Sequence, residues 1–265
     1  GGTTDVMARS MGAALSEALG QTVLIDNKPG ASGNVAASEV IRAQPDGYTF
    51  LIAPTSFETA NPFLFKQTIA PAKDLTPVVG VGRSQMYLLV KPESTFKDAK
   101  EFVAYARANP GKLSYSSAGA GTPPHLAGEL FKKVTGVFAT HIPYRGAAPA
   151  LQDVMANQAD YVFDPGIGFP HVRSGKVRML AVAGAKRSSF FPDVPTLAEL
   201  GFKGAVLWAK VEERNGDHVA ATLLPPTASA GNIFRPGAGA AERDAECRGR
   251  DRRARDADRG AADQS

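Results

Sequence analysis

Short apolar runs alternate with segments of helical periodicity along most of this 265-residue chain, and this alternation limits the possible folds more than any other feature. Apolar or β-branched runs predict strands at residues 22–25, 48–53, 86–90, 113–116, 139–143, 160–163 and 177–183. Apolar residues at helical spacing predict helices at residues 6–19, 34–43, 96–109, 124–134, 147–157 and 166–174. Strands that alternate with helices in this way indicate an α/β architecture with largely parallel sheets.

Composition argues against several function classes. The chain is 43% hydrophobic and 21% charged, with a net charge of +4 that is scattered rather than gathered into a basic stripe. Nucleic acid is therefore disfavoured as a partner. The single cysteine, Cys247, provides no disulfide framework, the four histidines lack metal-ligand spacing, and no apolar run reaches membrane-spanning length. The chain also contains no Gly-x-Ser-x-Gly elbow, which disfavours a serine hydrolase.

Two loops rich in glycine and small hydroxyl residues lead into predicted helices, GGTT at residues 1–4 and SAGAGT at residues 117–122. Glycine allows close approach to the backbone, and the N-terminus of a helix carries partial positive charge and free N–H groups. Two such loops facing each other would hold a molecule with a carboxylate at each end. The alternative interpretation is that each is only a tight turn. Neither loop matches a dinucleotide fingerprint or a P-loop.

Several long segments carry a family resemblance in order along residues 1–204. They are GGTTDVMAR, NKPGASGNVAA, PDGYTFLIAP, SYSSAGAGTPPHLAGELFK, IPYRGAAPALQDVMANQAD and PDVPTLAELGF. In these segments the chain resembles the tripartite tricarboxylate transporter solute receptors, the Bug-type receptors. The resemblance implies a periplasmic, monomeric receptor of the two-lobed, type II Venus-flytrap class, with no catalysis and no cofactor. It also implies that a small carboxylate is handed to a permease of one large and one small integral-membrane subunit.

The resemblance further implies a domain organisation. Residues 1–85, without a first strand, and 182–204 would form lobe one, and residues 86–181 would form lobe two. The crossings near residues 82–86 and 181–185 would act as the hinge. Closure would follow from ligand binding, because the ligand contacts both lobes only in the closed state.

The family's two ligand loops correspond to residues 1–5 and 117–122 of this chain, and residues near them would sort ligands. The ligand-binding residues expected from the resemblance are Gly2, Thr3, Thr4, Asp5, Thr55, Ser56, Ser117, Ala118, Gly119, Gly121, Thr122 and Asp164; no metal ligand is expected. Asp164 would accept a ligand hydroxyl or amine, or else cap the helix that follows it. Asp5 would alternatively satisfy helix N–H groups. Arg145 is either a second carboxylate clamp or a solvated turn residue, and His125 is either structural or a ligand contact.

The family pattern stops after residue 204. Residues 235–265 contain no Val, Ile, Leu, Met, Phe, Tyr or Trp, so this stretch buries too little apolar area to offset its ordering entropy, and residues 205–265 are predicted to be mostly disordered. The Ala-, Arg- and Asp-rich composition also suggests translation in a shifted reading frame, which would leave an inactive fragment. A receptor that presents its ligand to a sensor kinase stays an alternative, whereas an enzyme on an acidic substrate lacks a convergent catalytic set.

Overall fold

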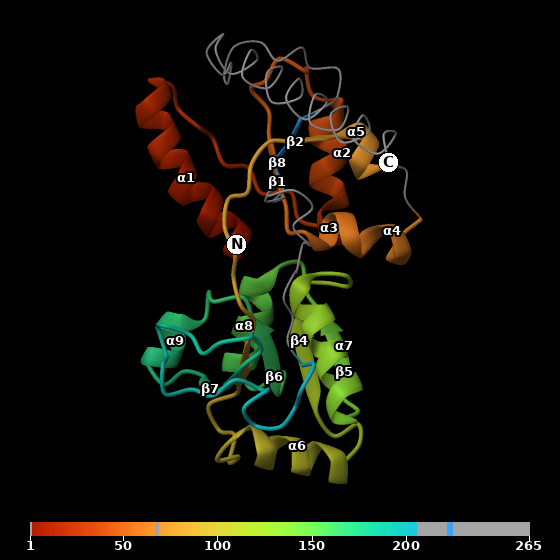
Figure 1. Cartoon of the computed structure of the whole chain (residues 1–265), viewed down its shortest axis with the longest axis vertical. Coiled ribbons are helices and arrows are strands. Elements are labelled where there is room, and N and C mark those ends of the chain that lie inside the picture. Colours follow the sequence, from red (N-terminus) through yellow and green to blue (C-terminus); the bar gives the residue numbers. More distant parts are fainter. Residues whose placement is uncertain (1, 67–68, 206–221, 225–265) are drawn as a thin grey trace, which may run out of the picture. The chain divides into compact units, whose positions relative to one another are not determined.

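The computed structural model describes residues 2–66, 69–205 and 222–224 (Figure 1). The chain divides into two compact units, Gly1–Ala43 with Phe50–Pro226, and Gln44–Thr49 with Thr227–Ser265. Residues 44–49 are the described part of the second unit, with bends at residues 45–47. Within the segment predicted to be disordered, Ala205 is described and Thr222–Leu224 form a strand. The remaining positions to which the disorder and reading-frame predictions apply lie outside the described residues.

A five-stranded sheet with the strand order β5-β4-β6-β3-β7 organises residues 87–182. Its strands are β3 (Tyr87–Val90), β4 (Ser114–Ser117), β5 (Thr140–Pro143), β6 (Tyr161–Asp164) and β7 (Arg178–Val182). β4 runs parallel to β5 and β6, whereas β3 runs antiparallel to β6 and β7. The predicted parallel character is therefore wrong for half of these pairings. The first residue of β3 pairs with the last residues of β6 and β7, so β3 enters where they end and runs the opposite way.

Helices cover both faces of this sheet. They are α6 (Ala99–Ala108), α7 (Pro123–Thr135), α8 (Ala147–Met155) and the short α9 (Phe169–Arg173). Leu88 and Val90 of β3 belong to the same buried cluster as residues of α6 and α7, whereas Tyr87 and Leu89 belong to a cluster with α8. This division follows from the two-residue periodicity of a strand. The predicted strands and helices of residues 86–183 are confirmed, each with small differences in its bounds.

Local chemistry explains where two of these helices lie. Asp98 begins α6 by accepting hydrogen bonds from the N–H groups of Lys100 and Glu101, at 2.8 and 2.9 Å from its Oδ1. Gly128 lets α7 approach β4 closely, since a Cβ at this position would lie 2.4 Å from the buried ring of Tyr115. The close approach at Gly128 positions the loop between β4 and α7.

Residues 2–85 form smaller elements. The helices are α1 (Thr3–Leu19), α2 (Asn34–Arg42), α3 (Ser56–Thr59), α4 (Asn61–Leu64) and α5 (Pro71–Asp74), with a 3₁₀ turn at Ala31–Gly33. An antiparallel sheet of order β1-β8-β2 joins β1 (Leu51–Ile52), β2 (Thr76–Pro77) and β8 (Thr222–Leu224). The helices predicted at residues 6–19 and 34–43 are confirmed, and Gly20 ends α1 in the left-handed conformation. The strand predicted at residues 48–53 is reduced to β1.

The strand predicted at residues 22–25 is wrong, because this segment joins no sheet among the described residues. Its side chains instead pack on α1: a Cβ at Gly12 would lie 3.2 Å from Ile25 and 3.6 Å from Val23. The N–H of Val23 donates to Ser16 Oγ at 2.9 Å. The β-branched residues thus contact a helix. The prediction failed because a strand requires a neighbouring strand, which the local sequence does not specify.

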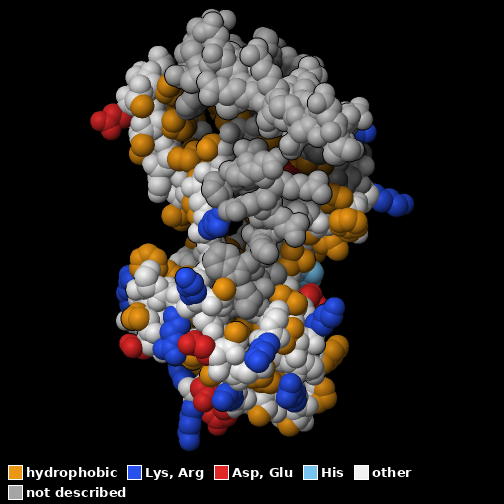
Figure 2. All heavy atoms as spheres, viewed as in Figure 1, with side chains coloured by type: hydrophobic (Ala, Val, Ile, Leu, Met, Phe, Trp, Pro, Cys, Tyr) orange, Lys and Arg blue, Asp and Glu red, His pale blue; other side chains and the backbone are white. Residues whose placement is uncertain are grey.

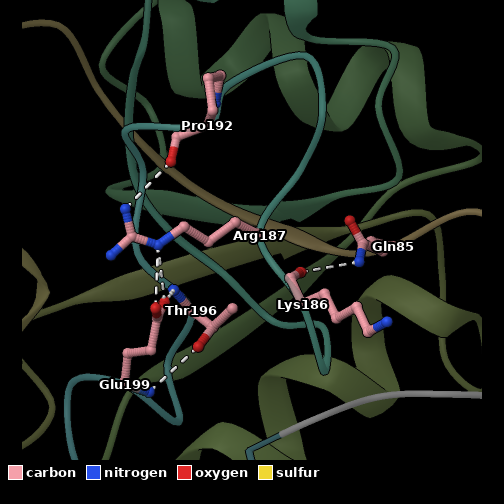
Figure 3. Close-up of polar contacts among 6 residues, drawn as sticks. All are labelled: Gln85, Lys186, Arg187, Pro192, Thr196 and Glu199. Atoms are coloured by element: carbon pink, nitrogen blue, oxygen red, sulfur yellow. Dashed lines mark hydrogen bonds and ion pairs between the residues drawn. The ribbon is translucent and has the colours of Figure 1, made fainter.

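The two predicted crossing segments are tied to each other. The N–H of Ala183 donates to the carbonyl of Met86 at 2.8 Å, and Gln85 Nε2 donates to the carbonyl of Lys186 at 3.0 Å. Beyond this contact, Arg187 pairs with Glu199 at 3.0 Å (Figure 3). The hinge role of these segments and the division of the chain into lobes remain predictions.

Charged side chains are interspersed on the surface. The face shown in Figure 2 carries Lys and Arg side chains among Asp and Glu side chains. Among the described residues three lysines form ion pairs, Lys28 with Asp26, Lys91 with Asp160 and Lys132 with Glu129. This arrangement agrees with the scattered basic charge expected from the sequence.

Candidate ligand-binding site

The first loop exposes the beginning of α1. Gly2 is the N-cap residue in an extended conformation and provides no side-chain cap, so the N–H groups of residues 3–5 have no helical acceptor. Among the described residues, none of these three N–H groups donates to a loop or side-chain acceptor. Thr3 Oγ1 donates to the carbonyl of Pro165 at 2.9 Å. The start of α1 therefore offers free N–H groups beside the end of β6.

Asp5 is engaged within its own region. Its Oδ1 accepts from Asn27 Nδ2 at 2.8 Å and lies 2.9 Å from Arg9 Nε. The hydrogen bond from Asn27, with the nearby Arg9 charge, lowers the pKa of Asp5 below its usual value, despite an opposing contribution from burial. The carboxylate is thus ionised at neutral pH and neutralised by Arg9. A ligand anion at this helix end would not meet an unpaired negative charge from Asp5.

The second loop lies between β4 and α7, but α7 presents few N–H groups. The helix begins with Pro123 and Pro124, and proline has no N–H. The N–H of Leu126 already donates to Thr122 at 3.0 Å. The expectation that this helix end offers a set of free N–H groups is therefore wrong for α7. Any anion binding by this loop must come from the N–H groups of residues 118–122 themselves.

Hydrogen bonds inside the loop leave two of those N–H groups free. Gly119 N donates to Ser117 Oγ at 3.1 Å, Gly121 N donates to His125 Nδ1 at 3.1 Å, and Thr122 N donates to the carbonyl of Gly119 at 3.3 Å. Within the described part of the chain, the N–H groups of Ala118 and Ala120 have no such acceptor. These two groups are the loop's available donors for a carboxylate.

Two histidines pack against the loop. His141 Nε2 lies 2.6 Å from Ser117 Oγ, and the ring of His141 is 4.3 Å from the ring of His125. Burial lowers the pKa of His125, and burial together with the nearby His125 lowers the pKa of His141 to about 4. Both rings are therefore neutral at pH 7. Sequence reasoning missed His141, because nothing in the spacing of residues 117 and 141 indicates that they touch.

Asp164 is buried at the end of β6, with 1% of its surface exposed. Its Oδ2 accepts from the N–H groups of Gly166 and Gly168 at 2.7 and 2.9 Å, in the loop before α9. Among the described residues no side chain caps α9, so the alternative in which Asp164 caps the helix that follows is wrong. Its Oδ1 is buried and has no hydrogen-bond partner among the described residues. Burial raises the pKa of Asp164 to about 6, with the two backbone hydrogen bonds opposing the shift. The second oxygen remains available to a ligand group that donates a hydrogen bond.

A further polar cluster surrounds α3 and α4. Ser56 is 3% exposed and Asn61 is fully buried. Within the part of the chain that the structure describes, neither Ser56 Oγ nor Asn61 Oδ1 has a hydrogen-bond partner. The Nδ2 group of Asn61 donates to the carbonyl of Ser32 at 3.0 Å and to Asn34 Oδ1 at 3.2 Å. A Cβ at Gly121 would lie 3.2 Å from Asn61 Oδ1. Asn61 thus lies against the second loop, and sequence reasoning did not select it. Thr55 lies next to this cluster as the N-cap residue of α3.

The two loops meet the same segment at residues 144–147. The N–H of Tyr144 donates to the carbonyl of Ser117 at 2.9 Å, and Ala147 Cβ would lie 3.6 Å from a Cβ at Gly2. Arg145, within this segment, is exposed. Because one segment contacts both loops, residues that are more than a hundred positions apart in the sequence become neighbours.

Gly121 is required by the backbone as well as by its surroundings. Its φ is +80°, and a Cβ there would lie 2.9 Å from Leu64 Cδ1. A Gly121→Val substitution would therefore disturb the loop whether or not a ligand binds.

The described residues contain no group of three or more His, Cys, Asp and Glu side chains that could hold a metal ion. Among the helices of the described segments, none is long and apolar enough to cross a membrane.

Comparison with solved structures identifies the class of fold. The chain resembles the periplasmic binding protein BugD, with a TM-score of 0.72, 32% identity, and coverage of 87% of this chain and 74% of that one. It also resembles Rpa4515 of R. palustris with adipate (TM-score 0.76, 35% identity, coverage 86% and 74%). A third similar structure is MatC of Rhodopseudomonas palustris with bound malate (TM-score 0.76, 31% identity, coverage 86% and 75%). The fold is that of the two-lobed periplasmic binding proteins.

The chain belongs to the tripartite tricarboxylate transporter family receptors, because that family's model matches residues 7–212. This match confirms the resemblance seen in the sequence motifs. Three curated relatives are 36–39% identical to the chain over 200–211 residues. The chain spans 60–65% of their length.

Proposed function

We propose that this chain is a periplasmic receptor that binds a small dicarboxylate and delivers it to an integral-membrane permease. The observation that carries the proposal is that two loops with free N–H groups contact the same segment. Residues 3–5 supply N–H groups at the start of α1, Ala118 and Ala120 supply two more, and both loops contact residues 144–147. Free N–H groups at such positions favour an anion.

The proposed ligand class follows from the chemistry of the donors and from the similar structures. One carboxylate would accept hydrogen bonds from the two loops. At the far end of the ligand, the Ser56 hydroxyl would donate to the second carboxylate. Asn61 Oδ1 and Asp164 Oδ1 can only accept, so they would serve a ligand hydroxyl instead. Two of the similar structures hold adipate and malate, which are both dicarboxylates. Binding would proceed without a chemical step, so adipate or malate incubated with the protein should be recovered unchanged.

Titration calorimetry with adipate, malate and their methyl esters tests the ligand class. Each esterification removes a negative charge and should weaken binding about tenfold or more, since a hydrogen bond to a charged group contributes roughly 1.5–3 kcal/mol. Equal affinity for adipate and its dimethyl ester would contradict the proposed carboxylate recognition.

A matched pair of serines tests the placement of the site. Ser56 and Ser94 are both buried, and the hydroxyl of each lacks a hydrogen-bond partner. Ser56 lies in the proposed site, whereas Ser94 follows β3 and its carbonyl accepts from Arg178. Ser56→Ala should weaken diacid binding by roughly a factor of 3–10, the effect of one hydrogen bond. Ser94→Ala should leave binding unchanged, and equal effects of the two substitutions would remove Ser56 from the site.

Delivery to a permease requires a separate measurement. The large and small permease subunits, reconstituted in vesicles, should import labelled diacid only when the receptor is present. Diacid binding without receptor-dependent import would support the ligand site and contradict delivery.

A further inference from the structure

We propose that His125 and His141 are positioning residues that hold residues 117–122 in the ligand-binding conformation without touching the ligand. This inference rests on the proposed function, since it concerns the same loop. Each histidine bonds one end of the loop: His141 Nε2 lies 2.6 Å from Ser117 Oγ, and His125 Nδ1 accepts the N–H of Gly121 at 3.1 Å.

The two attachment points enclose the loop's free donors. Ala118 and Ala120, whose N–H groups have no acceptor within the described segments, lie between residues 117 and 121. The direction of their N–H groups depends on the backbone at both ends. A hydrogen bond at each end therefore restricts the orientations that the free donors can take.

The two histidines act as one packed unit. Their ring centroids are 4.3 Å apart at an interplanar angle of 36°, and the ring of Tyr115 stacks on His141 at 4.8 Å and 24°. Tyr115 is fully buried and bonded through its hydroxyl to Glu129 at 2.6 Å. The imidazoles thus connect the loop to β4, β5 and α7, the rigid elements around it.

The acceptor atoms define the tautomer that the loop requires. Because His125 Nδ1 accepts the N–H of Gly121, a neutral His125 must carry its proton on Nε2. His141 uses the other ring nitrogen, Nε2, toward Ser117. The two positions therefore need hydrogen-bonding atoms at different distances from the backbone.

Amide substitutions distinguish these atoms. The Oδ1 of asparagine can replace Nδ1 of an imidazole, whereas the side-chain amide of glutamine reaches the position of Nε2. His125→Asn and His141→Gln should keep adipate affinity within about threefold of wild type. His125→Gln and His141→Asn should weaken it about tenfold, the factor expected for one lost hydrogen bond of roughly 1–1.5 kcal/mol. His171 on α9 provides the control: His171→Asn and His171→Gln should bind adipate as wild type does.

The crossed pattern decides between positioning and simple packing. A packing role would make the two substitutions at each position equivalent, or would rank them by side-chain volume in the same order at both positions. If the wild-type chain binds adipate and either of these packing patterns is found, the positioning role is overturned and the proposed function is not. A wild-type chain that binds neither adipate nor malate contradicts the proposed function, and the positioning role then fails with it.

Amide hydrogen exchange at Gly121 covers the case in which a variant at residue 141 does not fold. The Gly121 amide should be protected in wild type and in His125→Asn, and should exchange about tenfold faster in His125→Gln, because that variant lacks the acceptor. Equal exchange rates in the two variants would overturn the proposal.

Discussion

The sheet region at residues 86–205 and the region at residues 2–85 differ in how completely they bury their apolar side chains. Two large clusters fill the space on both faces of the five-stranded sheet, whereas six residues form the buried cluster of the earlier region. Within the described residues of the larger unit, nine large hydrophobic side chains before residue 86 are exposed, against three after it. Helices on both faces of a sheet shield its apolar side chains from water. Strands of two or three residues are too short to bury side chains in this way.

This difference predicts unequal responses to the removal of a buried ring. Phe131 packs among Phe102, Tyr161 and Phe163, so Phe131→Ala should lower the free energy of unfolding by about 3–5 kcal/mol. Phe57 is equally buried but lies in the small cluster between short helices. Phe57→Ala should cost less, about 3 kcal/mol or below, because that site collapses more easily. Urea denaturation measures both values, and an equal or larger loss at Phe57 would break the comparison.

The two aspartates at the candidate site should respond to pH in opposite directions. Burial raises the pKa of Asp164 to about 6, so its charged form destabilises the folded state above that pH. Asp164→Asn should therefore increase the free energy of unfolding at pH 7.5 by up to about 3 kcal/mol, and the gain should disappear as the pH falls from 6 toward 4.

Asp5 provides the contrast. Its lowered pKa means that its carboxylate stabilises the folded state above its unfolded pKa and loses this effect as the pH falls through the folded value. Asp5→Asn should thus be slightly destabilising at pH 7.5, by less than about 1 kcal/mol. Thermal unfolding at several pH values measures both variants. A destabilising Asp164→Asn at pH 7.5 would contradict the buried-charge interpretation.

The histidine pair should make the sheet region sensitive to acid. The folded pKa of His141, about 4, lies below its usual value of 6.5, so the unfolded state binds the proton first and stability falls as the pH decreases from 6.5 toward 4. The loss is at most about 1.4 kcal/mol per pH unit for one group. His141→Gln should reduce this slope. An unchanged slope would show that His141 contributes no pH dependence, and no histidine occurs before residue 86 to replace it.

The smallest effect is expected at an exposed ion pair of the sheet region. Arg187 pairs with Glu199, and both side chains are nearly half exposed (Figure 3). Arg187→Ala should therefore lower the free energy of unfolding by less than about 1 kcal/mol. A loss above 2 kcal/mol would show that this contact stabilises the sheet region more strongly than an exposed pair can. Glu199 keeps its hydrogen bond from the N–H of Thr196 in that variant, which makes the arginine side of the pair the cleaner test.

Helices α1, α2 and α6–α9 were predictable from the sequence because their stabilising contacts are local, whereas the four-residue helices α3, α4 and α5 were not predicted. The spacing of apolar residues and the stop at Gly20 define α1, and Asp98 marks the start of α6. The strand predicted at residues 22–25 failed, since a strand depends on a partner elsewhere in the chain. The lack of N–H groups at Pro123 and Pro124 was readable from the sequence, because proline lacks that group in any fold.

The sequence by itself determined the family, the positions of the two glycine-rich loops and most of the helices and strands around them. Only the tertiary structure decided the antiparallel course of β3, the contact of both loops with residues 144–147, and the meeting of His125 with His141. It also left Asp164 Oδ1 and Asn61 Oδ1 buried without hydrogen-bond partners in the described segments. Periodicity and turn chemistry act over a few residues, whereas strand pairing, burial and pKa shifts depend on groups that the folded chain brings together from distant positions.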